Sequence, residues 1–154
     1  MTTWLNIPAK GSSNGASSVN NCYTFHDVSS TWEEARDACS DMGAHLVTME
    51  TTEEWNKVKS LIAEKVKKRG SYTHWYIGLR KTGGTWKWTE AGSPSIPVAT
   101  DDSRWQPHQP SAGHETCGEI WYPTNLENPG HLNNILCNRK YSRPNMRGYI
   151  CENF

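Results

Sequence analysis

Five cysteines in a chain of 154 residues restrict the possible folds more than any other feature of this sequence. They are Cys22, Cys39, Cys117, Cys137 and Cys151. None belongs to a Cys-x-x-Cys pair, which argues against a zinc ribbon or a thioredoxin-type motif. In a chain rich in glycine and asparagine, these cysteines predict disulfide bonds and a secreted protein in an oxidising environment. Because their number is odd, at least one is left over, and the sequence alone does not determine the pairing.

The segment from Trp105 to Cys137 is the strongest candidate for a binding site. It is rich in side chains that carry oxygen, and it contains two cysteines about twenty residues apart. Hard cations such as calcium bind several neutral and anionic oxygens gathered on a flexible loop. The candidate ligands are Gln109, Ser111, Glu115, Asn133 and Asn134. A disulfide closing this segment would hold the two halves of such a site together, so we expect a binding site and not a catalytic one.

The charge balance and the length exclude several classes of protein. Sixteen basic and sixteen acidic residues give no net charge, so nothing favours nucleic acid or an anionic membrane as a partner. No apolar run approaches the roughly 20 residues of a transmembrane helix, and no signal peptide is visible. Residues 1–20 are rich in glycine, serine and asparagine, which predicts a flexible leader. The remaining residues, 21–154, are expected to form one domain.

Two helices are expected in the first half of this domain. Ser30 with Glu33 forms a capping-box pattern, followed by apolar residues at helical spacing and by Gly43 as a stop signal. Thr51 with Glu54 repeats the capping pattern before a second apolar stripe. Core packing explains both stripes, so we assign them no binding role.

Strands dominate the rest of the chain. Alternating or continuous apolar runs predict strands at Cys22–Phe25, His45–Met49, Trp75–Leu79, Thr85–Thr89, Cys117–Tyr122 and Arg147–Glu152. Residues 91–110 consist largely of proline, serine, glycine and aspartate, which predicts a long loop, and loops of this length are usually functional. Two helices followed by strands and one long loop predict an α+β domain.

In this order and at this spacing, the motifs resemble those of the C-type lectin-like domain family. The matching segments are Trp32–Ala35, Cys39, Gly43–Val47, Tyr76–Leu79, Trp86–Trp88, Gln109–Ser111, Cys117, Asn133–Asn134, Cys137 and Tyr149–Glu152. Each motif alone is weak, but together they span nearly the whole ordered chain. The resemblance implies two helices packed on small antiparallel sheets, with a long, disulfide-stapled binding loop. It also implies core positions for Trp86, Trp88 and Trp105.

The resemblance implies two disulfides, Cys39–Cys151 and Cys117–Cys137. In the loop-entropy model the longer closure contributes about 4.7 kcal/mol and the shorter about 3 kcal/mol. Cys22 is then left over, since no cysteine stands about ten residues before it, where longer family members carry one. We interpret Cys22 as an inert thiol. A disulfide-linked homodimer and a partner cysteine lost upstream are the alternatives.

The resemblance further implies a calcium-assisted sugar site, in which the ion and the sugar hydroxyls share the same side chains. Its ligands, carried over one by one, are Gln109, Ser111, Glu115, Asn133 and Asn134. Pro110 is the cis proline that turns its two neighbours to the same side. Glutamine at the first ligand position favours galactose over mannose. An aromatic side chain stacked on the sugar is a plausible addition, and the candidates are Trp121, Tyr122, His108, His114 and His131.

Three departures from the family pattern weaken this site. Ser111 stands where the family has asparagine or aspartate, Asn134 where it has aspartate, and Leu132 where it has tryptophan. Glu115 is left as the only carboxylate of the five ligands, and charge count tunes calcium affinity, so we expect weak binding at best. The second calcium position of the family looks absent, because Ala112 and Thr116 replace its acidic residues.

Two functions therefore compete. The first is a secreted lectin that binds a terminal hexose with weak calcium dependence. The second is a calcium-independent lectin-like module that binds a protein. The low number of carboxylates among the candidate ligands favours this second function. The presence of a side-chain oxygen at all five ligand positions favours the lectin. A zinc enzyme built on His108, His114, Glu115 and His131 lacks both helical histidine spacing and a nucleophile motif, so no enzyme is expected.

Overall fold

The computed structural model describes residues 4–8, 20–66, 73–89, 96–123, 129–140 and 147–153. Its helices are α1 (Trp32–Asp41) and α2 (Thr52–Val66). Its strands are β1 (Trp4–Pro8), β2 (Asn20–His26), β3 (His45–Leu46), β4 (Thr73–Thr82), β5 (Thr85–Trp88), β6 (Pro97–Val98), β7 (Cys117–Tyr122), β8 (His131–Ile135) and β9 (Arg147–Asn153). The α+β class predicted from the sequence is confirmed.

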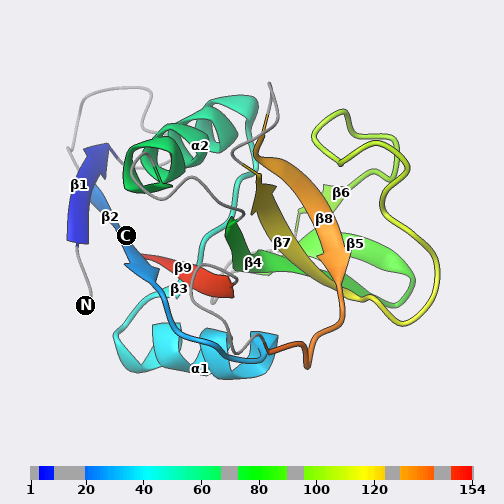
Figure 1. The fold of residues 1–154 in the computed structure, drawn as a ribbon, viewed down its shortest axis with the longest axis horizontal. Coiled ribbons are helices and arrows are strands. Elements are labelled where there is room, and N and C mark those ends of the chain that lie inside the picture. The colour runs from blue at the N-terminus through cyan, green and yellow to red at the C-terminus, as the bar shows by residue number, and fades with distance from the viewer. Residues whose placement is uncertain are drawn as a thin grey trace.

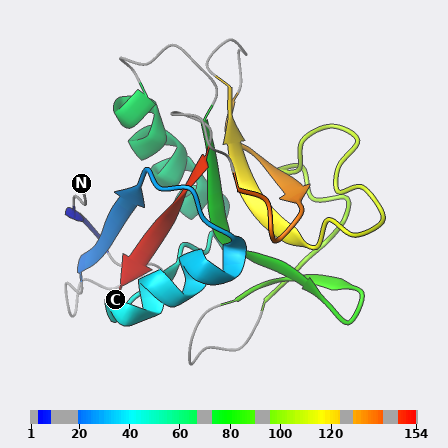
Figure 2. The ribbon, with the colours of Figure 1, turned by 60° about the horizontal axis from the view of Figure 1, so that its bottom comes forward.

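Strand β4 connects the two halves of the sheet. It pairs in antiparallel fashion with β5 and β7 and in parallel fashion with the last strand, β9. β9 in turn pairs with β2 and β3, so the two ends of the domain meet in one sheet, as Figure 2 shows by the order β2, β9, β4. β7 continues into an antiparallel hairpin with β8 (Figure 1). This hairpin carries the C-terminal half of the candidate site.

Apolar stripes place the two helices on either side of the sheet (Figure 1). Trp32, Ala35 and Cys39 are buried on α1, at the helical spacing seen in the sequence. The buried face of α2 is formed by Val58, Ile62 and Val66, together with the carboxylate-bearing Glu54. Trp86, Trp88 and Trp105 are also buried, which confirms the core positions that the family resemblance implied. No helix in the described ranges is long and apolar enough to cross a membrane.

The helix caps agree with the sequence at α2 and differ by one residue at α1. At α2 the Glu54 N–H donates to Thr51 Oγ1 at 3.1 Å, as predicted. At α1 the capping box is formed by Thr31 and Glu34, and not by Ser30 and Glu33. Both pairs satisfy the sequence pattern of a capping box, so the sequence alone does not distinguish them.

The two disulfides are those that the resemblance implied, Cys39–Cys151 and Cys117–Cys137. The first ties α1 to β9, and the second joins the start of β7 to the chain just beyond β8. Cys22 belongs to neither: it lies partly buried in β2, and its backbone N–H donates to Asn153 Oδ1 at 3.1 Å.

The segment expected to be a flexible leader contains a strand. Trp4–Pro8 forms β1, which pairs in antiparallel fashion with β2. The composition of residues 1–20 did not predict this strand, because the glycines and serines that indicate a leader stand beyond residue 10. Residues 1–3 and 9–19 lie outside the described residues. The boundary between leader and domain stays a prediction.

The predicted long loop is anchored by a buried arginine. Arg104 is 8% exposed and donates through its guanidinium to the Met49 carbonyl. Asp102 holds this guanidinium with two contacts of 3.0 Å, to Nε and to Nη2. Strand β6 and this anchor fix residues 96–105 on the domain, ahead of the candidate binding loop. Residues 91–95 lie outside the described residues.

Replacing Asp102 by asparagine is expected to lower the free energy of unfolding by about 1 kcal/mol near neutral pH. The hydrogen bond from the Arg104 side chain lowers the pKa of Asp102 below its ordinary 3.8. A lowered carboxyl pKa stabilises the fold above pH 3.8, and that contribution is lost as the pH falls through the folded-state value. Urea unfolding at about pH 7 and about pH 2 should therefore show a difference from wild type only at the higher pH. Asp101→Asn, a change at an exposed neighbour, should have no effect at either pH.

Candidate functional site

Four of the five predicted ligands converge around Ser111. The Gln109–Pro110 peptide bond is cis, as the resemblance implied. The Ser111 N–H donates to Gln109 Oε1 at 2.9 Å and to Asn134 Oδ1 at 3.1 Å. The Ser111 hydroxyl donates to Glu115 Oε1 at 2.9 Å. We call Gln109, Ser111, Glu115 and Asn134 the Ser111 cluster.

Asn134 joins the loop to strand β8. It is 1% exposed, and its amide donates to the Ser111 carbonyl at 2.9 Å and to the Glu115 carbonyl at 3.1 Å. Its β8 position pairs with Gly118, next to the disulfide-bonded Cys117 on β7. The loop is therefore held by side-chain hydrogen bonds to a strand that the disulfide fixes.

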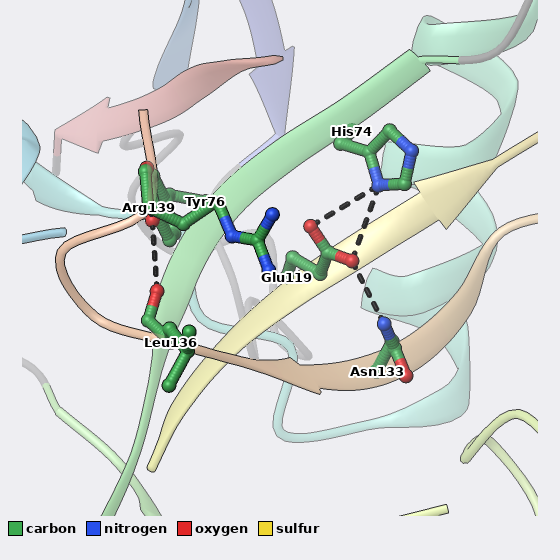
Figure 3. Close-up of polar contacts among 6 residues, drawn as sticks. All are labelled: His74, Tyr76, Glu119, Asn133, Leu136 and Arg139. Atoms are coloured by element: carbon green, nitrogen blue, oxygen red, sulfur yellow. Dashed lines mark hydrogen bonds and ion pairs between the residues drawn. The ribbon is translucent and has the colours of Figure 1, made fainter. Parts of the chain in front are cut away.

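Asn133 is not part of the Ser111 cluster, although the sequence predicted it as a ligand. Its amide donates to Glu119 Oε2 at 2.8 Å, and His74 Nδ1 lies 3.1 Å from the same oxygen and 3.2 Å from Oε1 (Figure 3). Successive residues of a strand point to opposite faces. Asn133 and its neighbour Asn134 therefore serve two different groups of residues.

The His74–Glu119–Asn133 group is the feature that sequence reasoning missed. Glu119 is fully buried, and the ring of Trp121 stacks on that of His74 at 6.0 Å between centroids. A carboxylate inside the otherwise uncharged strand Cys117–Tyr122 is a signal that was available in the sequence, because a buried charge requires partners. The partners themselves come from β4 and β8, which only the pairing of strands brings to β7.

The Ser111 cluster offers the type of ligand atom that a hard cation prefers, but it carries little negative charge. All its possible metal-binding atoms are oxygens, whereas calcium takes six to eight of them and binds more tightly as their charge increases. Glu115 supplies the only carboxylate, and the Ser111 hydroxyl already donates to it. Among the described residues, no three His, Cys, Asp or Glu side chains gather to form a metal site. An ion bound here would meet a single negative charge, and the residues considered as zinc ligands are not brought together in the described part of the chain.

The aromatic residues near the site in sequence are divided by the fold. His108 and His114 are exposed on the loop, and His108 has a left-handed backbone with φ of 70°. Trp121 packs on His74, as described above. Tyr122 and His131 lie at the far end of the β7–β8 hairpin, where Trp121 pairs with His131.

Comparisons with known proteins agree with this fold. The Lectin C-type domain family matches residues 28–153. Asialoglycoprotein receptor 2 of Rattus norvegicus is 38% identical over 103 residues, which cover 64% of this chain and 31% of the receptor. C-type lectin domain family 4 member E of Mus musculus is 33% identical over 135 residues, covering 85% of this chain and 54% of that protein. This chain spans between 31% and 61% of the length of the curated relatives it matches.

Solved structures resemble the whole domain. The C-type lectin domain of murine dendritic cell inhibitory receptor 2, solved in complex with N-glycan, has a TM-score of 0.65 at 23% identity. The alignment covers 86% of this chain and 90% of that one. Human lithostathine has a TM-score of 0.63 at 24% identity, covering 86% of this chain and 82% of the other. Likeness at this identity shows the fold.

Family membership rests on the match to residues 28–153, more than half of the chain. It agrees with the cysteine pairing, the cis peptide and the hairpin described above. Because Lectin C-type domains are binding domains without enzymatic activity, the prediction that the chain is not an enzyme is confirmed. The chain belongs to the C-type lectin domain family.

Proposed function

We propose that this chain is a secreted carbohydrate-binding module that recognises a terminal hexose through the Ser111 cluster. The observation that carries the proposal is the convergence of four polar side chains beside a cis peptide, on a loop that is held to a disulfide-stapled hairpin. Two polar atoms of the cluster, Gln109 Nε2 and Glu115 Oε2, have no hydrogen-bond partner among the described residues. One is a donor and the other an acceptor. Adjacent hydroxyls of a sugar can pair with both.

We further propose that calcium assists this binding weakly. A calcium ion would replace the hydrogen bond from the Ser111 hydroxyl to Glu115, and a single carboxylate would offer the ion little charge. Extracellular calcium modules bind with dissociation constants of about 10⁻⁴–10⁻³ M, and this site should lie at the weak end of that range. Gln109 at the first position favours galactose. Asn133 would join the ligands only by leaving Glu119, which further weakens the site.

Affinity chromatography on immobilised galactose and mannose tests this proposal. We expect retention on galactose with millimolar calcium, and reduced retention with EDTA. Glu115→Gln should weaken calcium-dependent retention by about tenfold, because it removes the only charge of the cluster. Asp101→Asn makes the same chemical change on an exposed side chain of the same long loop and should behave like wild type.

A calcium-independent module that binds a protein is the second candidate. It is favoured by the hydrogen bonds within the Ser111 cluster, which keep the loop together without an ion. No retention on either resin in excess calcium, together with a melting temperature that calcium leaves unchanged, would reject the lectin proposal and support this one.

A further inference from the structure

An open groove lies between α2 and the far end of the β7–β8 hairpin. Its volume is about 540 Å³, within the range of small-molecule sites. It is lined by Trp55, Lys59, Ser60, Ala63, Tyr122, Pro129 and His131. No residue of the Ser111 cluster lines this groove. Asn134 of the cluster pairs with Gly118 near one end of the hairpin, whereas His131 of the groove pairs with Trp121 near the other end. The groove and the Ser111 cluster are separate sites.

Among the described residues, packing contacts and not an ion pair hold Lys59 in this groove. Its ammonium lies 3.5 Å from the centroid of the Trp55 ring. Its methylene stem covers Gly130, where a Cβ atom would lie 2.6 Å from Lys59 Cδ. Throughout the described ranges Lys59 contacts no carboxylate, and burial lowers its pKa from the ordinary value. The described part of the groove therefore contains a partly desolvated cation without an anionic partner.

The other groups of the groove suit a sugar ring. The Tyr122 hydroxyl has no hydrogen-bond partner in the described part of the chain, and burial raises its pKa. Trp55 is fixed by its indole N–H, which donates to the Gly130 carbonyl at 2.7 Å. Aromatic faces pack against the apolar C–H face of a pyranose, while hydroxyl and imidazole groups bond its rim. Among the described residues, the lining contains no aspartate or glutamate that would repel an anion.

We propose that this groove binds an anionic sugar, with Lys59 contacting its charged group and Tyr122 and His131 contacting the ring. The anionic group is a carboxylate, as in a hexuronic acid, or a sulfate ester. Charge complementarity carries the choice, since the described part of the groove has a cation without a counter-ion and no acidic side chain. This site is independent of the proposed hexose site, and calcium plays no part in it.

Titration of the full chain with glucuronic acid, glucose 6-sulfate and glucose in EDTA tests the proposal. The indole N–H resonance of Trp55, assigned with a Trp55→Phe variant, reports on the groove. We expect a saturable shift with an anionic sugar, with a dissociation constant of about 1 mM for so small a ligand. Glucose should bind at least about tenfold more weakly, because it lacks the charged contact. Comparing the two anionic sugars distinguishes carboxylate from sulfate.

Two lysine variants separate a contact from a general charge effect. Lys59→Met keeps the stem over Gly130 and should weaken binding of the anionic sugar about tenfold. Lys57→Met removes the same charge from an exposed position of the same helix and should have no effect. Equal binding of glucose and the anionic sugars, equal losses in the two variants, or no saturable shift would each overturn the proposal. Because EDTA removes calcium, these outcomes do not depend on the Ser111 cluster.

Discussion

Replacing Cys39 and Cys151 together by alanine is expected to lower the free energy of unfolding by about 4–5 kcal/mol. The two cysteines are 112 residues apart, so their disulfide closes most of the domain and restricts the unfolded chain strongly. It also ties α1 to β9, the strand that joins β2 and β3 to β4. A loss of this size is a large part of the 5–15 kcal/mol that stabilises a typical domain. Urea unfolding measures it.

The second disulfide provides the comparison. Replacing Cys117 and Cys137 by alanine should cost about 3 kcal/mol, because this bond closes only 20 residues. Cys22→Ser should change stability little, since Cys22 belongs to neither disulfide. If replacing Cys117 and Cys137 lowered the free energy of unfolding more than replacing Cys39 and Cys151, loop closure would not be the dominant effect of these disulfides.

Replacing Glu119 by alanine is expected to lower the free energy of unfolding by about 3 kcal/mol. Glu119 is fully buried, and its carboxylate contacts both His74 and Asn133 (Figure 3). Removing the Glu119 side chain leaves His74 and Asn133 without their common partner and opens a cavity beside β7. Each unsatisfied buried polar group costs about 1–3 kcal/mol. Urea unfolding at neutral pH measures the loss.

Glu119→Gln and Asn133→Ala are the matched variants. Glutamine keeps the shape and one oxygen acceptor, so its cost should be smaller than that of alanine. Asn133→Ala removes one donor and leaves the contact with His74 intact, so it should also cost less. If Glu119→Ala were as stable as wild type, the buried group would not contribute to the fold. If Asn133→Ala abolished calcium-dependent sugar retention without loss of stability, Asn133 would be a ligand despite its contact with Glu119.

Most of the fold followed from local patterns. The buried positions of α1 and α2 are the ones that recur at helical spacing, and the alternation in Thr85–Trp88 predicted β5. Local patterns failed where two capping pairs fitted the sequence equally well. At α1 the observed cap, Thr31, lies one residue beyond the predicted cap, Ser30. Local patterns also missed β1, β6 and β8. The short polar strand β8 was missed because such strands are specified by their partners more than by their own residues.

The candidate site was predicted in part. The motif around Pro110 placed Gln109, Ser111 and Glu115 on one loop, and the structure brings them to Asn134. Asn133 was assigned to the same site because it is adjacent in sequence. Its side chain instead lies toward Glu119, since neighbouring residues of a strand face opposite ways.

Residue type and spacing determined the secondary structure, the family and the oxygen-rich character of the binding loop. These are local properties, carried by apolar periodicity, turn residues and motifs of a few residues. The tertiary structure decided which polar side chains meet. Strand pairing placed His74 and Asn133 on Glu119, and the approach of α2 to the hairpin placed Lys59 beside Trp55 and Tyr122. Such contacts join residues far apart in the chain, and their cost or gain depends on burial, which no local pattern contains.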